Sequence, residues 1–179
     1  MTVRGGCVCG AVRYVLSRNS LPPVICCHCR DCQTRSGSAF DQTAFVDVSE
    51  IEITGPLVTI ETKSLPSGAD LTDNVCGRCR TMIYNIYPAK PELVLLRACT
   101  LDDSHSIVPI VHAFTSRKQS WVKLSDDVFQ CEAAATPEAL KFAGAPVSPS
   151  TAGEGLPNAC AGSYRQLRSI LGKCNPSLI

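Results

Sequence analysis

The chain has 179 residues, of which 45% are apolar and 18% charged, and its net charge is +1. This length suits one domain with a tail, and the apolar content supports a globular core. A near-neutral chain has no excess of Lys and Arg to neutralise phosphates, so we expect no nucleic-acid partner. No apolar run approaches the roughly 18 residues of a membrane span, and no signal-peptide segment precedes Cys7. We therefore expect a cytoplasmic protein without a membrane partner.

Short runs of β-branched and aromatic residues predict a series of strands. Turn-forming segments such as Leu21-Pro22-Pro23 and Gly55-Pro56 separate them. No long amphipathic helix interrupts the series, so sheets of antiparallel hairpins are the expected architecture. The predicted strands cover residues 12–16, 24–27, 43–48, 52–54, 57–62, 82–87, 93–97 and 107–113.

A helix start follows these strands. Thr136 suits an N-cap, Pro137 the first helical position and Glu138 the first turn, so we predict a short helix that ends near Gly144. Residues 145–161 are rich in Pro, Ser, Gly and Ala, which is typical of a flexible linker. Residues 163–172 predict one further short helix. We therefore divide the chain into a domain at residues 1–144 and a linker with a C-terminal tail at residues 145–179.

The chain contains twelve cysteines. In a reducing compartment, closely spaced thiols bind metal or take part in chemistry more often than they form disulfides. Three clusters stand out, Cys7-Val8-Cys9, Cys26-Cys27-His28-Cys29-Arg30-Asp31-Cys32 and Cys76-Gly77-Arg78-Cys79. Zinc takes four such soft ligands in a tetrahedral site, so the clusters predict zinc binding.

The spacing alone leaves the division of the ligands open. The simplest arrangement is one ribbon-like site formed by the two CxxC pairs, which leaves Cys7, Cys9 and Cys27 unused. A division into four and three thiols uses all seven, and it gives one closed structural site and one open site with a vacant coordination position. Spacing does not say which cluster supplies which site.

Further motifs accompany the cysteine clusters in a characteristic order. They are Gly6-Cys7-Val8-Cys9-Gly10-Ala11-Val12-Arg13-Tyr14, Cys27-His28-Cys29-Arg30-Asp31-Cys32, Ser36-Gly37, Phe40, Gly55-Pro56, Ser67-Gly68, Cys76-Gly77-Arg78-Cys79, His112 and Trp121. Over residues 5–132 this order resembles the glutathione-dependent formaldehyde-activating enzyme family, which includes the centromere protein V domain. Arg80 and Val75 depart from the family pattern, which usually has glycine and an aromatic residue there.

The resemblance implies a mainly β, Mss4-like zinc-binding fold of antiparallel sheets with short helices. It also implies two zinc ions per chain. The ligands that it implies for the closed structural site are Cys7, Cys9, Cys76 and Cys79. Those that it implies for the open site are Cys27, Cys29 and Cys32.

An open three-thiolate zinc favours sulfur chemistry. Three thiolates leave a net charge of about −1 on the site, so its zinc acidifies water less than zinc held by neutral imidazoles. A thiol at the vacant position would be deprotonated and would stay nucleophilic. We therefore expect a zinc-dependent carbon–sulfur lyase or thiol-adduct enzyme that acts on a small electrophile or its glutathione conjugate. The resemblance implies this lyase activity, with glutathione as co-substrate.

Two residues other than cysteine are candidates for catalysis. His112 lies in an apolar run that is typical of a core histidine, whereas its family position implies a role in a pocket. Asp31 either acts in the chemistry or holds the turn of its cluster. His28 is expected to point away from the metal, and Trp121 is expected in the core or a pocket wall.

The other cysteines are expected to be ordinary thiols. Cys26 is adjacent to Cys27 in an extended segment, so its side chain should face the other way and be buried. The isolated cysteines are Cys99, Cys131, Cys160 and Cys174.

Two other functions are compatible with the sequence. The open zinc could act without glutathione, as a Lewis acid on a carbonyl substrate of a tailoring or detoxifying enzyme. The domain could also be a non-catalytic zinc scaffold. The scaffold alternative predicts no small-molecule pocket and a fourth protein ligand at the second site, with Cys26 or His28 the nearest candidates.

Overall fold

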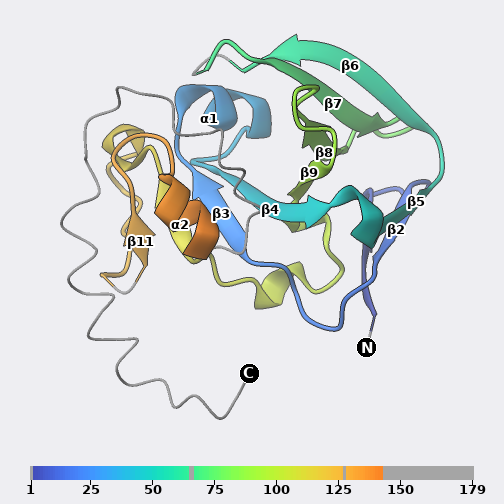
Figure 1. Cartoon of the computed structure of the whole chain (residues 1–179), viewed down its shortest axis with the longest axis horizontal. Helices are drawn as coiled ribbons and strands as arrows, with labels where there is room; N and C mark the ends of the chain where they lie inside the picture. The colour runs from blue at the N-terminus through green and yellow to red at the C-terminus, as the bar shows by residue number, and fades with distance from the viewer. Residues whose placement is uncertain (1, 65–66, 127, 143–179) are drawn as a thin grey trace.

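The computed structural model describes residues 2–64, 67–126 and 128–142. Within them the fold is mainly β and contains two sheets (Figure 1). The strands are β1 (Val3–Gly6), β2 (Arg13–Leu16), β3 (Val24–Cys27), β4 (Asp41–Asp47), β5 (Ile51–Thr54), β6 (Leu57–Lys63), β7 (Asp70–Cys76), β8 (Met82–Ile86), β9 (Leu93–Arg97), β10 (Val111–Ala113) and β11 (Phe129–Gln130). The α-helices are α1 (Arg30–Ser36) and α2 (Pro137–Phe142). The prediction of a mainly β fold with short helices is confirmed.

The smaller sheet has the order β1-β2-β5, and the larger has the order β11-β10-β3-β4-β9-β8-β7-β6. Most neighbouring strands are antiparallel, as predicted, but β10 pairs in parallel with both β3 and β11. This departure arises because β10 enters the sheet after the long segment that follows β9, and not through a hairpin.

The main core lies between the two sheets. Tyr14 and Leu16 of β2 pack there with alternate residues of the large sheet, among them Ala44 and Val46 of β4. Because side chains alternate along a strand, the odd-numbered residues of β4 face the opposite side of the large sheet. There a second apolar cluster forms around Ile25, and it includes Val111, Phe129, Cys131 and Ala139.

Each of the eight predicted strands has a counterpart, with shifts at the ends. The largest shift is at β10, which forms only at the end of the predicted segment 107–113. The predictions omitted β1, β7 and β11, as well as α1. Strand β1 contains Gly5, whose place a larger residue could not take, because an added Cβ would lie 2.2 Å from the Tyr14 hydroxyl oxygen.

The predicted helix start at Thr136 is confirmed. The backbone amide of Ala139 donates to Thr136 Oγ1 at 3.3 Å, which is an N-cap interaction at the start of α2. The predicted helix end near Gly144, the linker at 145–161 and the helix at 163–172 lie outside the described residues. No helix in the described part of the chain is long and apolar enough to cross a membrane.

Candidate metal centres and active-site cavity

The structure brings four cysteines from distant segments together. Cys7 and Cys9 lie between β1 and β2, and Cys76 ends β7 with Cys79 in the following turn. All four sulfur atoms lie within 4.8 Å of one another. The Val12 amide donates to Cys7 Sγ at 3.2 Å and the Arg78 amide to Cys76 Sγ at 3.4 Å, and such contacts stabilise thiolates. We call these residues the four-cysteine group.

The turn after Cys79 explains one departure from the family pattern. Arg80 has a φ of 64°, in the left-handed region that glycine adopts most easily. Its amide donates to the Cys76 carbonyl at 3.0 Å and closes the turn. The turn therefore keeps the backbone shape expected of a glycine, although an arginine occupies the position.

A second group of three cysteines forms where β3 joins α1. Cys27 ends β3, Cys29 is the N-cap residue of α1, and Cys32 lies in its first turn. Their sulfur atoms lie within 4.8 Å of one another. Helix α1 ends at Gly37, which has a φ of 63° and supplies the usual left-handed cap. We call these residues the three-cysteine group.

The three thiols favour a negative charge on Cys29. Its pKa is lowered to about 2, first by a hydrogen bond from the Cys27 thiol and then by one from Cys32. The Cys32 backbone amide also donates to Cys29 Sγ, at 3.4 Å. The pKa of Cys27 is raised, chiefly by its hydrogen bond to Cys29, and that of Cys32 is raised by its hydrogen bonds to Cys27 and then to Cys29. Clustered thiols thus compete for protons. A divalent metal relieves this competition, because it binds all of them as thiolates.

The donor sets suit two different metal sites. Four thiolates complete a tetrahedral zinc site, whereas three leave one position open. Neither candidate fourth ligand joins the three-cysteine group. Cys26 is fully buried, in register with Gln42 on the sheet face opposite to Cys27. His28 Nε2 lies 2.9 Å from His112 Nδ1 and is engaged there.

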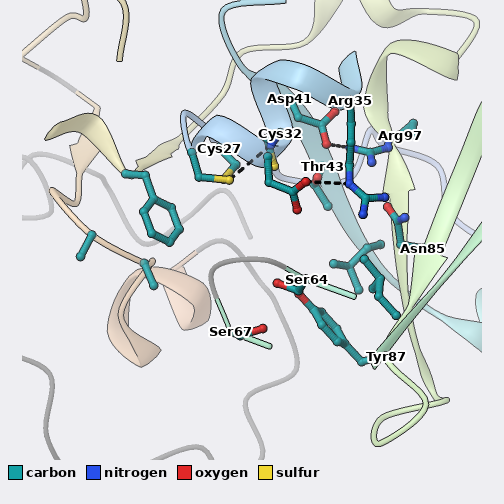
Figure 2. Close-up of a pocket in the computed structure, with 17 residues that line it drawn as sticks. Cys27, Cys32, Arg35, Asp41, Thr43, Ser64, Ser67, Asn85, Tyr87 and Arg97 are labelled. Carbon is teal, nitrogen blue, oxygen red and sulfur yellow. Dashed lines mark hydrogen bonds and ion pairs between the residues drawn. The ribbon is translucent and has the colours of Figure 1, made fainter. Parts of the chain in front are cut away.

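The three-cysteine group opens onto a cavity of about 460 Å³ (Figure 2). Its floor is one face of the large sheet, where Cys27, Thr43 and Arg97 belong to neighbouring strands and share that face. The side chains that line it are Cys27, Cys29, Asp31, Cys32, Arg35, Asp41, Thr43, Ser64, Ser67, Leu71, Asn85, Tyr87, Leu95, Arg97, Phe114, Ala133 and Ala134. A cavity of this size is typical of small-molecule sites.

Charged side chains line the part of the cavity near α1. Arg97 pairs with Asp41, and both are largely buried. Arg35 binds Asp73 at 2.6 Å and Asp31 at 2.9 Å. Burial lowers the pKa of Arg97, but an arginine stays charged across the physiological range. Both arginines are thus matched by carboxylates.

Tyr87 and Ser64 lie across the cavity from Cys27 and Cys32 (Figure 2). Burial raises the pKa of the Tyr87 hydroxyl, so it keeps its proton at neutral pH. A hydrogen bond between Tyr87 and Ser64 partly offsets this shift, so the pair can offer one hydroxyl proton to a bound ligand.

Of the two predicted catalytic residues, the structure brings Asp31 to the cavity but not His112. Asp31 accepts a hydrogen bond from Arg35 Nε and lines the cavity beside the cysteines. His112 pairs in register with Cys26, which places it on the opposite sheet face, and it is buried against His28. Burial lowers the pKa of His112 to about 4.

The remaining candidates are placed as follows. His28 is fully buried. Trp121 is 69% exposed and so lies outside the core, but it lines a shallow groove beside α1, in line with the pocket-wall alternative. Its Nε1 donates to Gln119 Oε1 at 2.6 Å. Cys26 is buried as expected, which raises its pKa to about 12. Cys131 is buried and Cys99 is exposed, while Cys160 and Cys174 lie outside the described residues.

Sequence reasoning missed most of the polar cavity residues. These are Arg35, Asp41, Ser64, Asn85, Tyr87 and Arg97. Asp41, Asn85 and Arg97 lie within or at the ends of strands that also carry apolar residues. Polar side chains are unusual at such positions, because they are rarely buried without a partner. That pattern could have identified them as candidates.

The chain matches a known protein family over more than half of its length. A family model described as glutathione-dependent formaldehyde-activating enzyme matches residues 2–117. The chain therefore belongs to this family, which confirms the resemblance.

Two individual proteins are similar to the chain. A Halomonas elongata protein, provisionally named a glutathione-dependent formaldehyde-activating enzyme, is 27% identical over 130 residues, or 69% of this chain and 82% of that protein. The crystal structure of a Rhodobacter sphaeroides protein is also similar to this chain. The match covers 59% of this chain and 97% of that protein's chain, with a TM-score of 0.44 and 18% sequence identity.

Proposed function

We propose that the chain is a zinc-dependent enzyme that forms or cleaves a carbon–sulfur bond between a thiol and a small electrophile, with glutathione as the thiol. The observation that carries this proposal is the position of the three-cysteine group, whose members all line the 460 Å³ cavity. The four-cysteine group lies elsewhere, between β1–β2 and β7–β8, and suits a structural zinc. We also propose that the protein is cytoplasmic.

The open site would activate the thiol. Zinc held by Cys27, Cys29 and Cys32 would lower the pKa of a thiol that enters the vacant coordination position. In the forming direction, the sulfur of the thiol bonds to the carbonyl carbon of the electrophile. The electron pair of the carbon–oxygen π bond moves to the oxygen, which takes up the proton that the thiol released. Cleavage is the reverse.

Protein side chains would handle the proton and the oxygen. Asp31 is our candidate proton acceptor, because it lines the cavity and its Oδ1 alone is engaged by Arg35. Tyr87 and Ser64, across the cavity from the cysteines, are candidate hydrogen-bond donors to the substrate oxygen. His112 would act only indirectly, by holding His28 behind the metal ligands.

The alternatives make different demands on the site. A non-catalytic scaffold predicts a fourth protein ligand at the second site and no pocket. Among the described residues, no fourth ligand joins the three-cysteine group, and a cavity lies beside it. A Lewis-acid enzyme that works without glutathione would use the same open site. Turnover that does not depend on added thiol would favour that alternative.

Zinc content and turnover test the proposal together. We expect elemental analysis of reduced, freshly purified protein to give about two zinc ions per chain, as the two donor groups require. Cys29→Ser should lose one ion and the glutathione-dependent turnover of formaldehyde, measured by NMR exchange, while it keeps its circular dichroism spectrum. Cys99→Ser, at an exposed thiol outside both groups, is the matched control and should keep both. Full activity in Cys29→Ser would refute the proposal.

A further inference from the structure

Phe114 has an unusual backbone for its size. Its φ is 56°, in the left-handed region, where a bulky side chain is a true outlier. Backbone hydrogen bonds to the next segment hold it there. The Phe114 amide donates to the Ala133 carbonyl at 2.7 Å, and the Thr115 amide donates to the Cys131 carbonyl at 3.0 Å. Strain that the surroundings maintain in this way is concentrated at functional sites.

The strained residue lines the cavity, together with the segment that holds it. Phe114, Ala133 and Ala134 supply an apolar part of the lining, which we call the apolar wall, and Leu71 and Leu95 add further apolar lining from the sheet. Ala133 and Ala134 lie beyond residues 2–117, the part matched by the family model. This part of the wall is therefore contributed by a segment outside the family's common region.

The cavity is too large for a one-carbon electrophile alone. A water molecule occupies about 30 Å³ in the liquid, so a molecule with two heavy atoms fills a small fraction of 460 Å³. The peptide part of glutathione is a poor match for the apolar wall, because its carboxylates need cations. Arg35 and Arg97, the two cationic residues of the described lining, are already paired with aspartates.

We propose that the wall of Phe114, Ala133 and Ala134 binds an apolar substituent of the electrophile. The preferred substrate would then be an aldehyde with a hydrocarbon chain, or its thiol adduct, and not formaldehyde. This inference rests on the proposed function. Carbonyl carbon and oxygen would lie near the three-cysteine group, and the hydrocarbon would extend along the wall.

The test is a series of aldehydes on the zinc-loaded full chain with glutathione. We expect kcat/KM to rise from propanal through butanal to hexanal, aldehydes of similar electrophilicity, by about fourfold for each methylene that is buried. Phe114→Asn removes the ring but keeps a residue that adopts the left-handed conformation readily. It should lower kcat/KM for hexanal by about tenfold or more relative to kcat/KM for formaldehyde, in line with the loss of several methylene contacts.

Ala134→Leu places a larger side chain on the wall and so narrows the cavity, which should lower hexanal turnover selectively. Glu132→Leu is the matched control, because Glu132 is exposed and does not line the cavity. Wild-type turnover that does not rise with chain length would overturn the inference while leaving the proposed function intact. Equal losses for formaldehyde and hexanal in Phe114→Asn would overturn it too, because Phe114 would then have only a structural role.

Binding measurements separate this inference from the proposed function. If no aldehyde is turned over, the proposed function fails, and calorimetric titration of the zinc-loaded protein with ethanethiol and hexanethiol then tests the wall directly. Tighter binding of hexanethiol, lost in Phe114→Asn, would support the apolar site. Equal affinities for the two thiols would overturn it.

Discussion

Arg35 joins helix α1, which carries Cys32 of the three-cysteine group, to the β6–β7 hairpin. Its guanidinium donates to Asp73 Oδ2 at 2.6 Å, Asp31 Oδ1 at 2.9 Å and Thr62 Oγ1 at 2.8 Å. The Arg35 side chain is 26% exposed and that of Asp73 only 9%. A change at Arg35 should therefore destabilise the domain and loosen one wall of the cavity.

The size of the effect follows from the three partners. Arg35→Met keeps the apolar stem but removes the charge. The bond to buried Asp73 contributes about 1.5–3 kcal/mol, as charged hydrogen bonds do, and the bond to Thr62 about 0.5–1 kcal/mol. The Asp31 pair, four residues apart on a short helix, adds about 0.3–0.5 kcal/mol. We expect a loss of about 3 kcal/mol, which lowers Tm by about 6–12 °C in a protein of this size.

Calorimetry of zinc-loaded protein checks this value. The double variant Arg35→Met/Asp73→Asn should be more stable than the sum of the two single losses predicts, because neither partner is then left as an unpaired buried charge. Lys63→Met is the matched control, since Lys63 and Asp70 form an exposed pair, 68% and 72% exposed, of the kind worth about 0–1 kcal/mol. Strictly additive single losses, or an Arg35→Met effect no larger than that of Lys63→Met, would refute the reasoning.

Three further predictions concern the metal, pH and the core. Cys76→Ser should lose the structural zinc and, unlike Cys29→Ser, much of the folded signal in circular dichroism. The reason is that the four-cysteine group joins segments 67 residues apart. An unchanged spectrum with one zinc lost would contradict this. Lowering the pH from 6.5 towards 4 should destabilise the protein, because the folded state holds the pKa of His112 at about 4, chiefly by burial, so the unfolded chain takes up a proton that the folded chain does not. The shift in Tm between pH 7 and pH 5 should therefore be smaller in His112→Gln than in the wild type, and equal shifts would count against this explanation. Tyr14→Phe should cost about 1 kcal/mol, since the buried Tyr14 hydroxyl bonds to Thr100 Oγ1 at 2.8 Å; denaturant unfolding measures this, and a difference within error would show that the bond is replaced.

The sequence was sufficient for the strands whose side chains are mainly apolar. Strand β9, for example, is a continuous apolar run that ends in Arg97, and its observed bounds match the predicted 93–97. Strand β7 escaped prediction because Asp73 and Asn74 have low strand propensity. Both are nevertheless buried, since Arg35 and Asn85 bind Asp73, and Thr59 binds Asn74 at 2.9 Å. Such partners come from other helices and strands and cannot be inferred from local sequence.

The cysteine groups were predictable from the family resemblance, but the cavity was not. Spacing left open which clusters join, whereas the structure forms the four-plus-three division that the resemblance implies. The position of His112 depends on the parallel pairing of β10 with β3, which places it level with Cys26 and not with Cys27. A shift of one residue would have reversed that face, so the sequence alone could not separate a core histidine from a pocket histidine.

The different roles of the two cysteine groups follow from where their ligands lie along the chain. The four-cysteine group draws on two segments that are far apart in the sequence, the β1–β2 loop and the end of β7 with its following turn, so an ion bound there would tie distant strands together. The three-cysteine group comes from six consecutive residues at one strand–helix junction, so its thiols reach an ion from one side only. The other side faces the cavity, where no cysteine, and no histidine among the described lining residues, completes the shell. A local run of ligands therefore suits the open site that we propose, and the size and apolarity of the cavity lining would then determine which substrate can occupy it.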